Sequence, residues 1–460
     1  MNHRLFIPLS VCFIVASVSL SANALPSYAR QTGLPCSGCH YNPPELNPAG
    51  RAFKLLAYVD RTDNSNIEAQ PGDKRRAGLE MLKTLPLGAW FETSFTSTKA
   101  TQTGTQNGNF EFPQDISLFL AGAWAEHVGS FLQVTYNTQS DHFSMDNTDI
   151  RYARKTQLSK RDLIYGLMLN NNPTVEDLWN TTPVWGYPFI ASDSAPTPAA
   201  STIITSLGQD VAGFGGYTMF DNHWYAAGTV YRSDHIGSSQ PTNGQGASIN
   251  IRGLAPYWRV AWQNTGRKDV IEVGAYGIHV SATPGNVTGL EDKYTDVGPD
   301  IEYDHTFGRD VLSVRGTYLY ERSDLAATFA AGGAAQAAHH LNTGNANVEY
   351  HFGNRISAQA GTFLTSGTSD ISLFAPAALS GSANGSPRST GLIAAFSVWP
   401  KQNIELAVQY TAYTRFKDLQ RNTPTFATLA AAGKNPSRPE MLMILPHRPD
   451  SMNGRHARAR

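Results

Sequence analysis

Apolar and polar residues alternate along most of the chain, from Leu85 onward, in segments of roughly ten residues. In IELAVQYTAY (404–413) the Ile, Leu, Val and Tyr positions face one side, and Glu, Gln and Thr face the other. DVLSVRGTYLY (310–320) follows the same rule, with Ser, Arg and Thr opposite Leu, Val and Tyr. This two-residue period predicts β-strands with one apolar and one polar face.

The connections between these segments fall into two classes. Seven are short: EHVGS (126–130), LSKRD (158–162), FDNHW (220–224), TGRKD (265–269), TFGRD (306–310), FGNR (352–355) and PKQN (400–403). They alternate with long connections rich in Gly, Ser and Asn, which is typical of an outer-membrane barrel. One strand before the first turn, fourteen around the seven turns and one after the last give about sixteen. A soluble sandwich or propeller is the alternative, but more uniform loops are expected there.

The longest of the long connections runs from Asn170 to about Gln209 and opens NNNPTVEDLWNTTPVWGYPF. Thr174 is positioned to cap a short helix that includes Asp177. Trp179 and Trp185 follow closely, and exposed Trp in a loop requires an explanation. The segment is therefore either a surface loop with exposed aromatic residues or a loop that folds into the barrel.

The first residues have the features of an export signal. His3 and Arg4 precede an apolar run from Leu5 to Leu20, and Ala-Asn-Ala at 22–24 forms a cleavage site. We expect a signal peptide over 1–24; an uncleaved anchor helix is the alternative. The formal net charge of −1 gives no indication of nucleic acid binding.

After the signal, the chain keeps two cysteines, both in PCSGCH (35–40). A zinc site needs a second ligand pair, and no further Cys pair follows. A disulfide of this spacing is typical of thioredoxin-like proteins, whose βαβ pattern is absent here. His40 directly after Cys39 favours one covalent c-type haem, with Cys36 and Cys39 as thioether attachment points and His40 as proximal iron ligand.

We expect this haem module to span 25–84. Asn47 followed by Pro48 predicts a helix start, and Phe53, Leu56 and Ala57 fall on one helical face that forms a small core, covers the haem, or both. Met81 is the candidate for the distal iron ligand, as the one Met or His of the module after His40. The alternatives near predicted periplasmic turns are His127, His223, His305 and His351.

The segment LPSYARQTGLPCSGCHYNPPELNPAGRAFKLLAY (25–58) resembles the front of the fused outer-membrane cytochrome–porins. Arg30, Gln31 and Gly33 match this family's pattern before the Cys pair, and the 170–189 loop is also similar to the family's. The family includes outer-membrane Fe(II)-oxidising cytochromes. The resemblance implies a monohaem electron conduit across the outer membrane, with an extracellular donor such as Fe(II), a periplasmic cytochrome or other acceptor, and outer-membrane lipid as partners.

The end of the chain departs from that family, whose members close with a strand ending on an aromatic residue. After Asn435 the chain runs PSRPEMLMILPHRPDSMNGRHARAR. Met441–Leu445 has the composition of a strand, but three prolines surround it and the end is basic. The sequence thus predicts a barrel over 85–446 and an atypical tail over 447–460, and it leaves the closure of the barrel open.

Three functions are compatible with these features. The first is electron transfer through the haem, which includes the oxidation of Fe(II). The second is passive diffusion through a porin with a structural haem module. The third is a haem-based sensor or binder with an open iron site. The sequence names no electron donor and no direction of electron flow.

Overall fold

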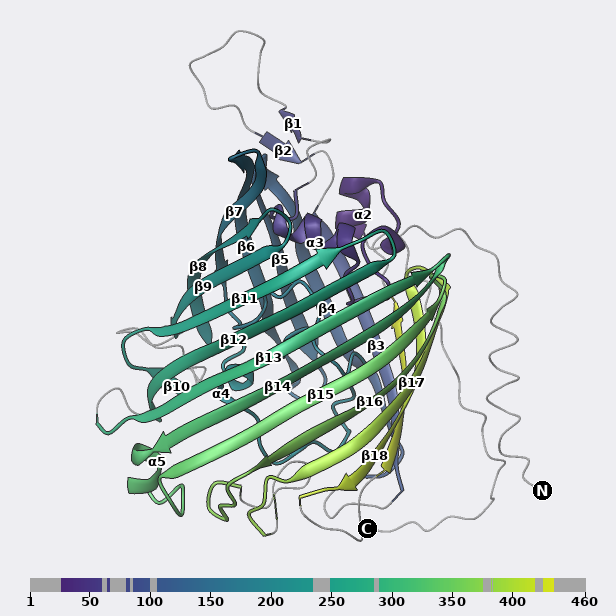
Figure 1. Ribbon diagram of the computed structural model, residues 1–460. Coiled ribbons are helices and arrows are strands. Elements are labelled where there is room, and N and C mark those ends of the chain that lie inside the picture. Colours follow the sequence, from purple (N-terminus) through teal and green to yellow (C-terminus); the bar gives the residue numbers. More distant parts are fainter. Residues whose placement is uncertain are drawn as a thin grey trace, which may run out of the picture.

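A closed antiparallel β-barrel makes up most of the computed structural model, which describes residues 26–59, 64–66, 80–82, 86–99, 106–234, 249–284, 289–374, 382, 384–417 and 425–433 (Figure 1). Apart from β10, each strand of the barrel pairs with the next one along the chain, β9 pairs with β11, and the last strand, β19, pairs with the first strand of the ring, β3. The strands are β3 (Leu87–Thr98), β4 (Asn109–Ala125), β5 (Val128–Asn137), β6 (His142–Leu158), β7 (Arg161–Asn170), β8 (Val211–Phe220), β9 (Trp224–Ser233), β10 (Ile249–Ile251), β11 (Ala255–Thr265), β12 (Asp269–Pro284), β13 (Asp292–Phe307), β14 (Asp310–Leu325), β15 (Ala338–Phe352), β16 (Ile356–Gly367), β17 (Ser389–Lys401), β18 (Ile404–Arg415) and β19 (Thr425–Gly433).

The ring has sixteen strand positions, as the sequence predicts. The sheet contains 17 strands, but β10 and β11 both pair with β12 and together form one interrupted strand. The seven short turns predicted from the sequence join β4–β5, β6–β7, β8–β9, β11–β12, β13–β14, β15–β16 and β17–β18. All of them therefore lie at one end of the barrel. The other end has the remaining connections, which are long as predicted except between β5 and β6, where the chain turns in four residues (138–141).

The strand that closes the barrel is β19, which pairs with β18 on one side and β3 on the other. It lies before Asn435, so the ring closes upstream of the unusual terminal segment. Met441–Leu445 and the predicted tail over 447–460 lie outside the described residues. The predicted signal peptide over 1–24 also lies outside them.

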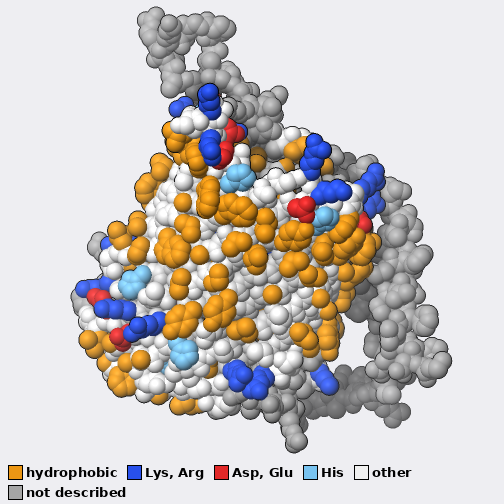
Figure 2. Space-filling model, in the orientation of Figure 1, with side chains coloured by type: hydrophobic (Ala, Val, Ile, Leu, Met, Phe, Trp, Pro, Cys, Tyr) orange, Lys and Arg blue, Asp and Glu red, His pale blue; other side chains and the backbone are white. Residues whose placement is uncertain are grey.

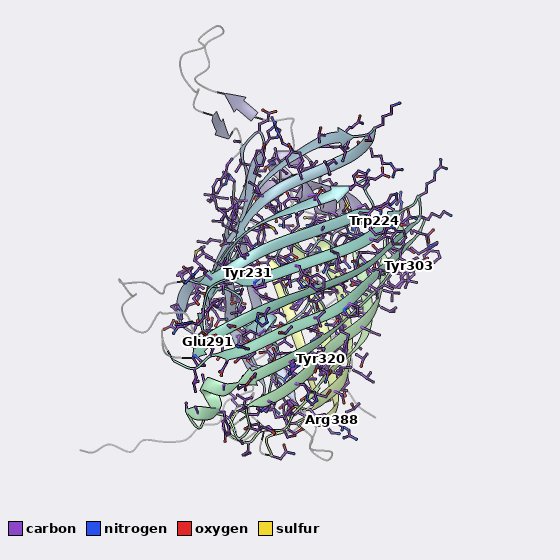
Figure 3. All side chains as sticks on the ribbon, turned by 60° about the vertical axis from the view of Figure 1, so that its left-hand side comes forward. Trp224, Tyr231, Glu291, Tyr303, Tyr320 and Arg388 are labelled. Carbon is purple, nitrogen blue, oxygen red and sulfur yellow. The ribbon has the colours of Figure 1, made fainter. Side chains whose placement is uncertain are left out.

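The outer surface of the barrel is apolar, as the alternation predicts. On β14, Val314 and Tyr318 are 36% and 42% exposed, whereas Ser313 and Arg315 between and beside them are buried. Hydrophobic side chains spread over the barrel face, and charged groups lie mainly toward its margins (Figure 2). Trp224 and Tyr303 lie toward the short-turn end of their strands, where Figure 3 labels them. A closed barrel with an apolar exterior and aromatic residues near its edge is the fold of outer-membrane proteins.

Five short helices accompany the barrel in the described residues: α2 (Pro26–Thr32), the 3₁₀ helix η1 (Cys36–Gly38), α3 (Pro48–Leu55), α4 (Ile203–Ser206) and α5 (Ala326–Ala330). A small separate sheet pairs β1 (Asn64–Asn66) with β2 (Glu80–Leu82). Helices α2 and α3 lie at the short-turn end of the ring (Figure 1). None of the helices in the described part of the chain is long and apolar enough to cross a membrane.

The longest connection, between β7 and β8, folds into the barrel. Leu178 and Trp179 are fully buried, and Trp179 packs in one cluster with Leu55 of α3 and with apolar residues of the lumen wall. Asn180 Oδ1 accepts a hydrogen bond from the Leu46 amide at 2.9 Å. The loop from one end of the barrel and the N-terminal module from the other therefore meet inside the ring. Of the two alternatives that the sequence left open, the structure has the inward fold.

Candidate functional site: the Cys-x-x-Cys-His module in the barrel lumen

The Cys-x-x-Cys-His segment forms a single tight turn. The Cys39 and His40 amides donate to the Cys36 carbonyl at 3.1 and 2.9 Å, so all three side chains project from the same turn. Both cysteines are half-buried and unbridged. Burial, with a smaller contribution from Cys36, raises the pKa of the Cys39 thiol. Two thiols and an adjacent imidazole on one turn are the donor set of a c-type haem, so the residues present fit that group.

The turn lies directly against the barrel rim. The Cys36 amide donates to Gln402 Oε1 at 3.0 Å, and its thiol contacts the Gln402 carbonyl at 3.5 Å. Gln402 belongs to the short β17–β18 turn. The predicted attachment site is therefore fixed at the short-turn mouth of the barrel.

Helix α3 begins where the sequence predicts. Asn47 Oδ1 accepts hydrogen bonds from the Ala49 and Gly50 amides, both at 3.0 Å, and Pro48 is the first helical residue. The Asn47 amide in turn donates to the Cys39 carbonyl at 2.9 Å. The helix cap is thus also the support of the Cys-x-x-Cys-His turn. The predicted apolar face is helical only in part, because α3 ends at Leu55 and Ala57 has φ of +59°. Phe53 is half-buried, Leu56 packs against the lumenal core and Ala57 is fully buried.

Gly50 is required because α3 lies very close to the backbone of the Cys-x-x-Cys-His turn. A Cβ at Gly50 would lie 2.2 Å from the Cys39 carbonyl oxygen and 3.0 Å from the carbon of the same group. Because both of these atoms are backbone, the contact cannot be relieved by a side-chain rotation. The turn and α3 would have to separate.

We therefore predict that Gly50→Ala displaces the Cys-x-x-Cys-His turn. Overpacking of this kind costs about 1–3 kcal/mol or more, and limited proteolysis of the folded protein should cut the module faster than in the parent. The matched control is Gly228→Ala, because a Cβ there meets only the Tyr257 carbonyl oxygen at 3.9 Å. Equal protease sensitivity of the two variants would contradict the role given to Gly50.

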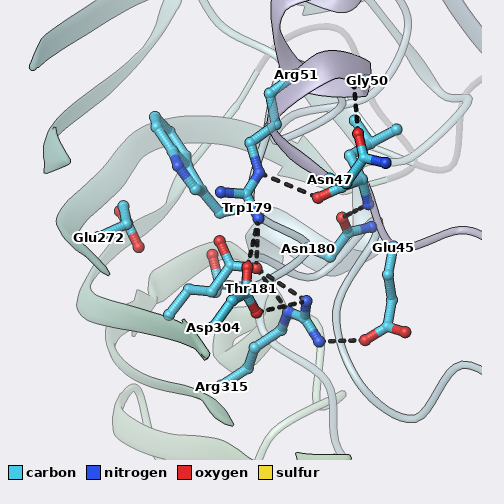
Figure 4. A network of polar contacts seen from close by, with 12 residues as sticks. Glu45, Asn47, Gly50, Arg51, Trp179, Asn180, Thr181, Glu272, Asp304 and Arg315 are labelled. Atoms are coloured by element: carbon cyan, nitrogen blue, oxygen red, sulfur yellow. Dashed lines mark hydrogen bonds and ion pairs between the residues drawn. The ribbon is translucent and has the colours of Figure 1, made fainter. Parts of the chain in front are cut away.

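The module is joined to the barrel wall by buried ion pairs (Figure 4). Arg51 Nη2 lies 2.7 Å from Glu302 Oε1 and 3.1 Å from Asp304 Oδ2, both on β13. Arg315 on β14 lies 2.9 Å from the same Glu302 oxygen and also pairs with Glu45 of the module. Burial raises the pKa of Glu45 well above its usual value, and Arg315 opposes that rise. Removal of one partner from such a pair typically costs about 3–5 kcal/mol, because the other charge is left buried and uncompensated.

A second buried network ties the inward loop to the wall. Arg259 Nη2 lies 2.7 Å from Asp300 Oδ2, 3.3 Å from Asp177 Oδ1 and 3.5 Å from Glu272 Oε1. Its guanidinium carbon is 5.1 Å from the centre of the Trp179 ring. All of these groups are buried or nearly so. The lumen is therefore filled by protein at this level.

The predicted helix at Thr174 does not form. Thr174 has φ of +71°, outside the helical region, and Asp177 instead accepts from the backbone amides of Trp179, Thr181 and Thr182. Asp177 does accept hydrogen bonds from free backbone amides, as a capping residue would, but these amides belong to an irregular turn and not to a helix. The helix of this connection is α4, some thirty residues further on.

Lys54 connects the module to the inward loop. Its Nζ donates to the carbonyls of Val175 and Asp177 at 2.8 and 2.7 Å and lies 4.9 Å from the centre of the Trp185 ring. Burial, followed by the nearby positive charge of Arg151, lowers the pKa of Lys54 to about 7. The contact is thus made through neutral acceptors and an aromatic face, without a carboxylate.

Arg30, Gln31 and Gly33 match the family pattern in the sequence without an assigned role, and the structure shows the contacts that they make. Arg30 Nη2 donates to the Leu87 carbonyl at 2.6 Å. The Gln31 side chain donates to the Tyr58 carbonyl and accepts from the Ala123 amide. Gly33, with φ of +68°, follows directly after α2. These residues hold α2 at the barrel mouth. Glu45, Arg51 and Lys54 were not predicted as site residues.

The candidates for the distal ligand differ in their position relative to the module. Met81 lies in β2, but its side chain is outside the described residues, so its ligation stays a prediction. His305 Nδ1 contacts Asp269 at 2.6 Å and His223 Nδ1 contacts the Gln263 carbonyl at 2.8 Å, both near turns; His127 lies in a turn beside Glu126. His351 is fully buried, and its ring stacks on Tyr41 at 5.6 Å. Among the four histidines, His351 is the one in contact with the module.

Comparison with known proteins gives no matching family model and no matching curated protein. Among solved structures, the chain is similar to OprB of Pseudomonas putida (7% identity, TM-score 0.48, 76% of this chain and 94% of that chain). It is also similar to the outer membrane channel DcaP of Acinetobacter baumannii (10% identity, TM-score 0.46, 76% of this chain and 96% of that chain). A third is OmpT of Vibrio cholerae (9% identity, TM-score 0.42, 76% and 98%, in a loop deletion mutant).

The fold and the site together define the class of protein. It is a sixteen-position, porin-like outer-membrane β-barrel whose lumen holds both its own N-terminal module and an inward loop. That statement depends on the strand pairing and apolar exterior of the chain itself.

Proposed function

We propose that this protein carries electrons across the bacterial outer membrane through one covalent c-type haem. In this proposal it belongs with the fused cytochrome–porins, takes electrons from an extracellular donor such as Fe(II), and passes them to a periplasmic acceptor. The observation that carries the proposal is the position of the Cys36–Cys39–His40 turn, bonded to Gln402 at the mouth of the barrel. A redox group at that position has the lumen on one side and the periplasm on the other.

The chain's own residues would perform three tasks in this function. Cys36 and Cys39 would hold the haem covalently, and His40 would bind its iron. Gly50 and Asn47 hold the turn against α3, and the Arg51 ion pairs hold α3 against the barrel wall. Together they would keep the haem at one position in the mouth of the barrel. The filled lumen limits the entry of water and solutes. The haem itself supplies a one-electron ferrous–ferric couple, whose potential depends on burial and hydrogen bonding.

The cofactor is tested first. The purified protein is expected to carry one haem that stays with the chain on denaturing gels and stains for peroxidase activity. Cys36→Ala combined with Cys39→Ala should remove the stain, because no thioether can form. The matched control, Ser37→Ala in the same turn, should keep it. Covalent haem in the double variant would overturn the assignment.

The orientation is tested with inserted tags. Long loops of outer-membrane barrels face outward, so a tag at Gly332 should be labelled on intact cells and a tag at Gly308 should not. The two sites are matched: each glycine has positive φ, 76° and 68°, and a Cβ at either meets nothing within 4 Å. Gly385 is less suitable, because a Cβ there would lie 2.6 Å from the Ile371 backbone nitrogen. Labelling at Gly308 alone would reverse the proposed orientation.

A passive porin with a structural haem module is the second candidate, since a barrel of this size is also the fold of diffusion channels. It requires an open path through the lumen, so the two functions differ in their expected conductance. A haem-based sensor is the third. It requires an open iron position and fast binding of carbon monoxide, which a protein with two axial ligands would not give.

A further inference from the structure

Three buried side chains meet where the module contacts the barrel wall. One of them, Glu45, also pairs with Arg315. Glu45 comes from the module, and Glu349 and His351 come from β15 of the barrel wall. They are 1%, 0% and 0% exposed. One ligand atom from each can be chosen so that all three lie within 4.8 Å of one another.

Each of the three side chains uses one polar atom for a protein partner and leaves the other without a hydrogen bond; two of these atoms, Glu45 Oε2 and His351 Nε2, lie 3.6 Å apart. Glu45 Oε1 pairs with Arg315, whereas Oε2 has no hydrogen bond. Glu349 Oε1 accepts from Asn42 Nδ2 at 3.1 Å, whereas Oε2 has none. His351 Nδ1 lies 2.7 Å from the same Asn42 nitrogen, whereas Nε2 has no hydrogen bond. Buried polar atoms without a partner are costly, so three in one place call for a ligand.

The charges around this point do not balance. Four buried carboxylates (Glu45, Glu302, Asp304 and Glu349) surround two buried guanidinium groups (Arg51 and Arg315). With all four carboxyls ionised and His351 neutral, these groups would carry an excess of two negative charges, which in the absence of a cation only protonation can relieve. An uncompensated buried charge is strongly unfavourable. A single divalent cation has the charge that neutralises the excess.

From these observations we propose that Glu45, Glu349 and His351 bind one divalent transition-metal cation, which fastens the N-terminal module to the barrel wall. One imidazole and two carboxylates suit borderline ions such as Zn²⁺, Mn²⁺ or Fe²⁺. Ligands at about 2.1 Å from one ion lie at most roughly 4.2 Å apart, so the three side chains need only a small inward shift.

The groups behind the ligands fit this role. Arg315 orients Glu45, and Asn42 contacts both Glu349 and His351 on the side away from the proposed ion. An imidazole that binds metal through Nε2 carries its proton on Nδ1, so metal binding requires Asn42 Nδ2, which lies 2.7 Å from Nδ1, to move away, and Glu349 Oε1, 3.5 Å from Nδ1, is the acceptor within reach of that proton. The stacked Tyr41 ring, 5.6 Å from the His351 ring, restricts the imidazole further. The inference does not depend on the proposed electron transfer, but it assigns His351 to the cation and so removes this residue from the candidates for the distal haem ligand.

The test uses the full-length protein in detergent, stripped with a chelator and dialysed against Mn²⁺ or Zn²⁺. We expect one ion per chain by elemental analysis, which reads these metals separately from haem iron. Glu349→Gln and His351→Gln should each weaken binding at least about tenfold. Glu321→Gln, which changes a buried carboxylate beside α4, is the matched control and should bind as the parent does.

Two further measurements separate metal ligation from general charge balance. Electron spin-echo spectra of bound Mn²⁺ should contain a nitrogen coupling that His351→Gln removes and Glu321→Gln keeps. Heat-modifiable mobility on gels confirms that each variant still forms its barrel. The proposal is overturned if the folded parent binds no more Mn²⁺ or Zn²⁺ than the two ligand variants, or if bound Mn²⁺ has no nitrogen neighbour.

Discussion

Sealed liposomes that contain this protein and enclose an electron acceptor are expected to reduce that acceptor when Fe(II) is added outside. In His40→Ala the rate should fall to that of protein-free liposomes, because the predicted iron ligand and the attachment motif are lost together. The lipid bilayer is an insulator, so the protein offers the only route for charge. Absorbance of the enclosed acceptor gives the rate directly, and a membrane-impermeant reductant can replace Fe(II).

The matched control is His142→Ala, which removes an exposed imidazole at the start of β6 in the long-loop half of the barrel. It should transfer electrons as the parent does. Gel mobility must establish that His40→Ala still forms its barrel, so that loss of rate is not loss of fold. No acceptor reduction by the parent, or equal rates in the parent and His40→Ala, would refute the electron-conduit function.

Removal of the inward loop is expected to open the barrel. Replacing residues 173–208 with a short Gly-Ser linker takes away the buried Trp179 and the Asp177 partner of Arg259. Sixteen-stranded barrels without such a filling leave an aqueous channel, so single-channel conductance in planar bilayers should rise about tenfold or more. The parent should give little or no conductance.

The control for this experiment shortens a different long connection. Deleting Gly332 and Gly333 changes the loop between α5 and β15, where Gly332 has open space around it. This variant should remain as closed as the parent. If the parent already conducts as well as the loop deletion, the lumen is open in the membrane, and the passive porin becomes the better account.

Strand number and turn positions could be predicted because lipid imposes a simple rule on a barrel. Outward residues in the lipid-facing part of each strand are mostly apolar and every second residue faces inward, so the period is visible even in a short segment such as 310–320. The Asn47–Pro48 helix start was equally predictable, since a cap depends on adjacent residues alone. Local rules of this kind need no knowledge of the rest of the chain.

The interior could not be predicted in the same way. Glu302, Asp304 and Arg315 occupy ordinary inward positions on two strands, and nothing near them in the sequence indicates the module residues that they bind. Thr174 and Asp177 carry a valid capping pattern, but Arg259 and three backbone amides take up the Asp177 carboxylate. Tertiary partners therefore override the local preference at the places where the lumen is filled.

The distances along the chain between partners have a consequence for how the protein is made. Arg51 contacts Glu302, which lies 251 residues further along the chain, and Cys36 contacts Gln402, which lies 366 residues further along. Contacts of such high sequence separation form late, because the intervening chain must first be ordered. We therefore expect the N-terminal module to dock late in assembly, and a covalent group of the proposed kind would reach Cys36 and Cys39 before that step. If the proposed haem is attached to the cysteines, its attachment would therefore come before β19 pairs with β3 and closes the ring.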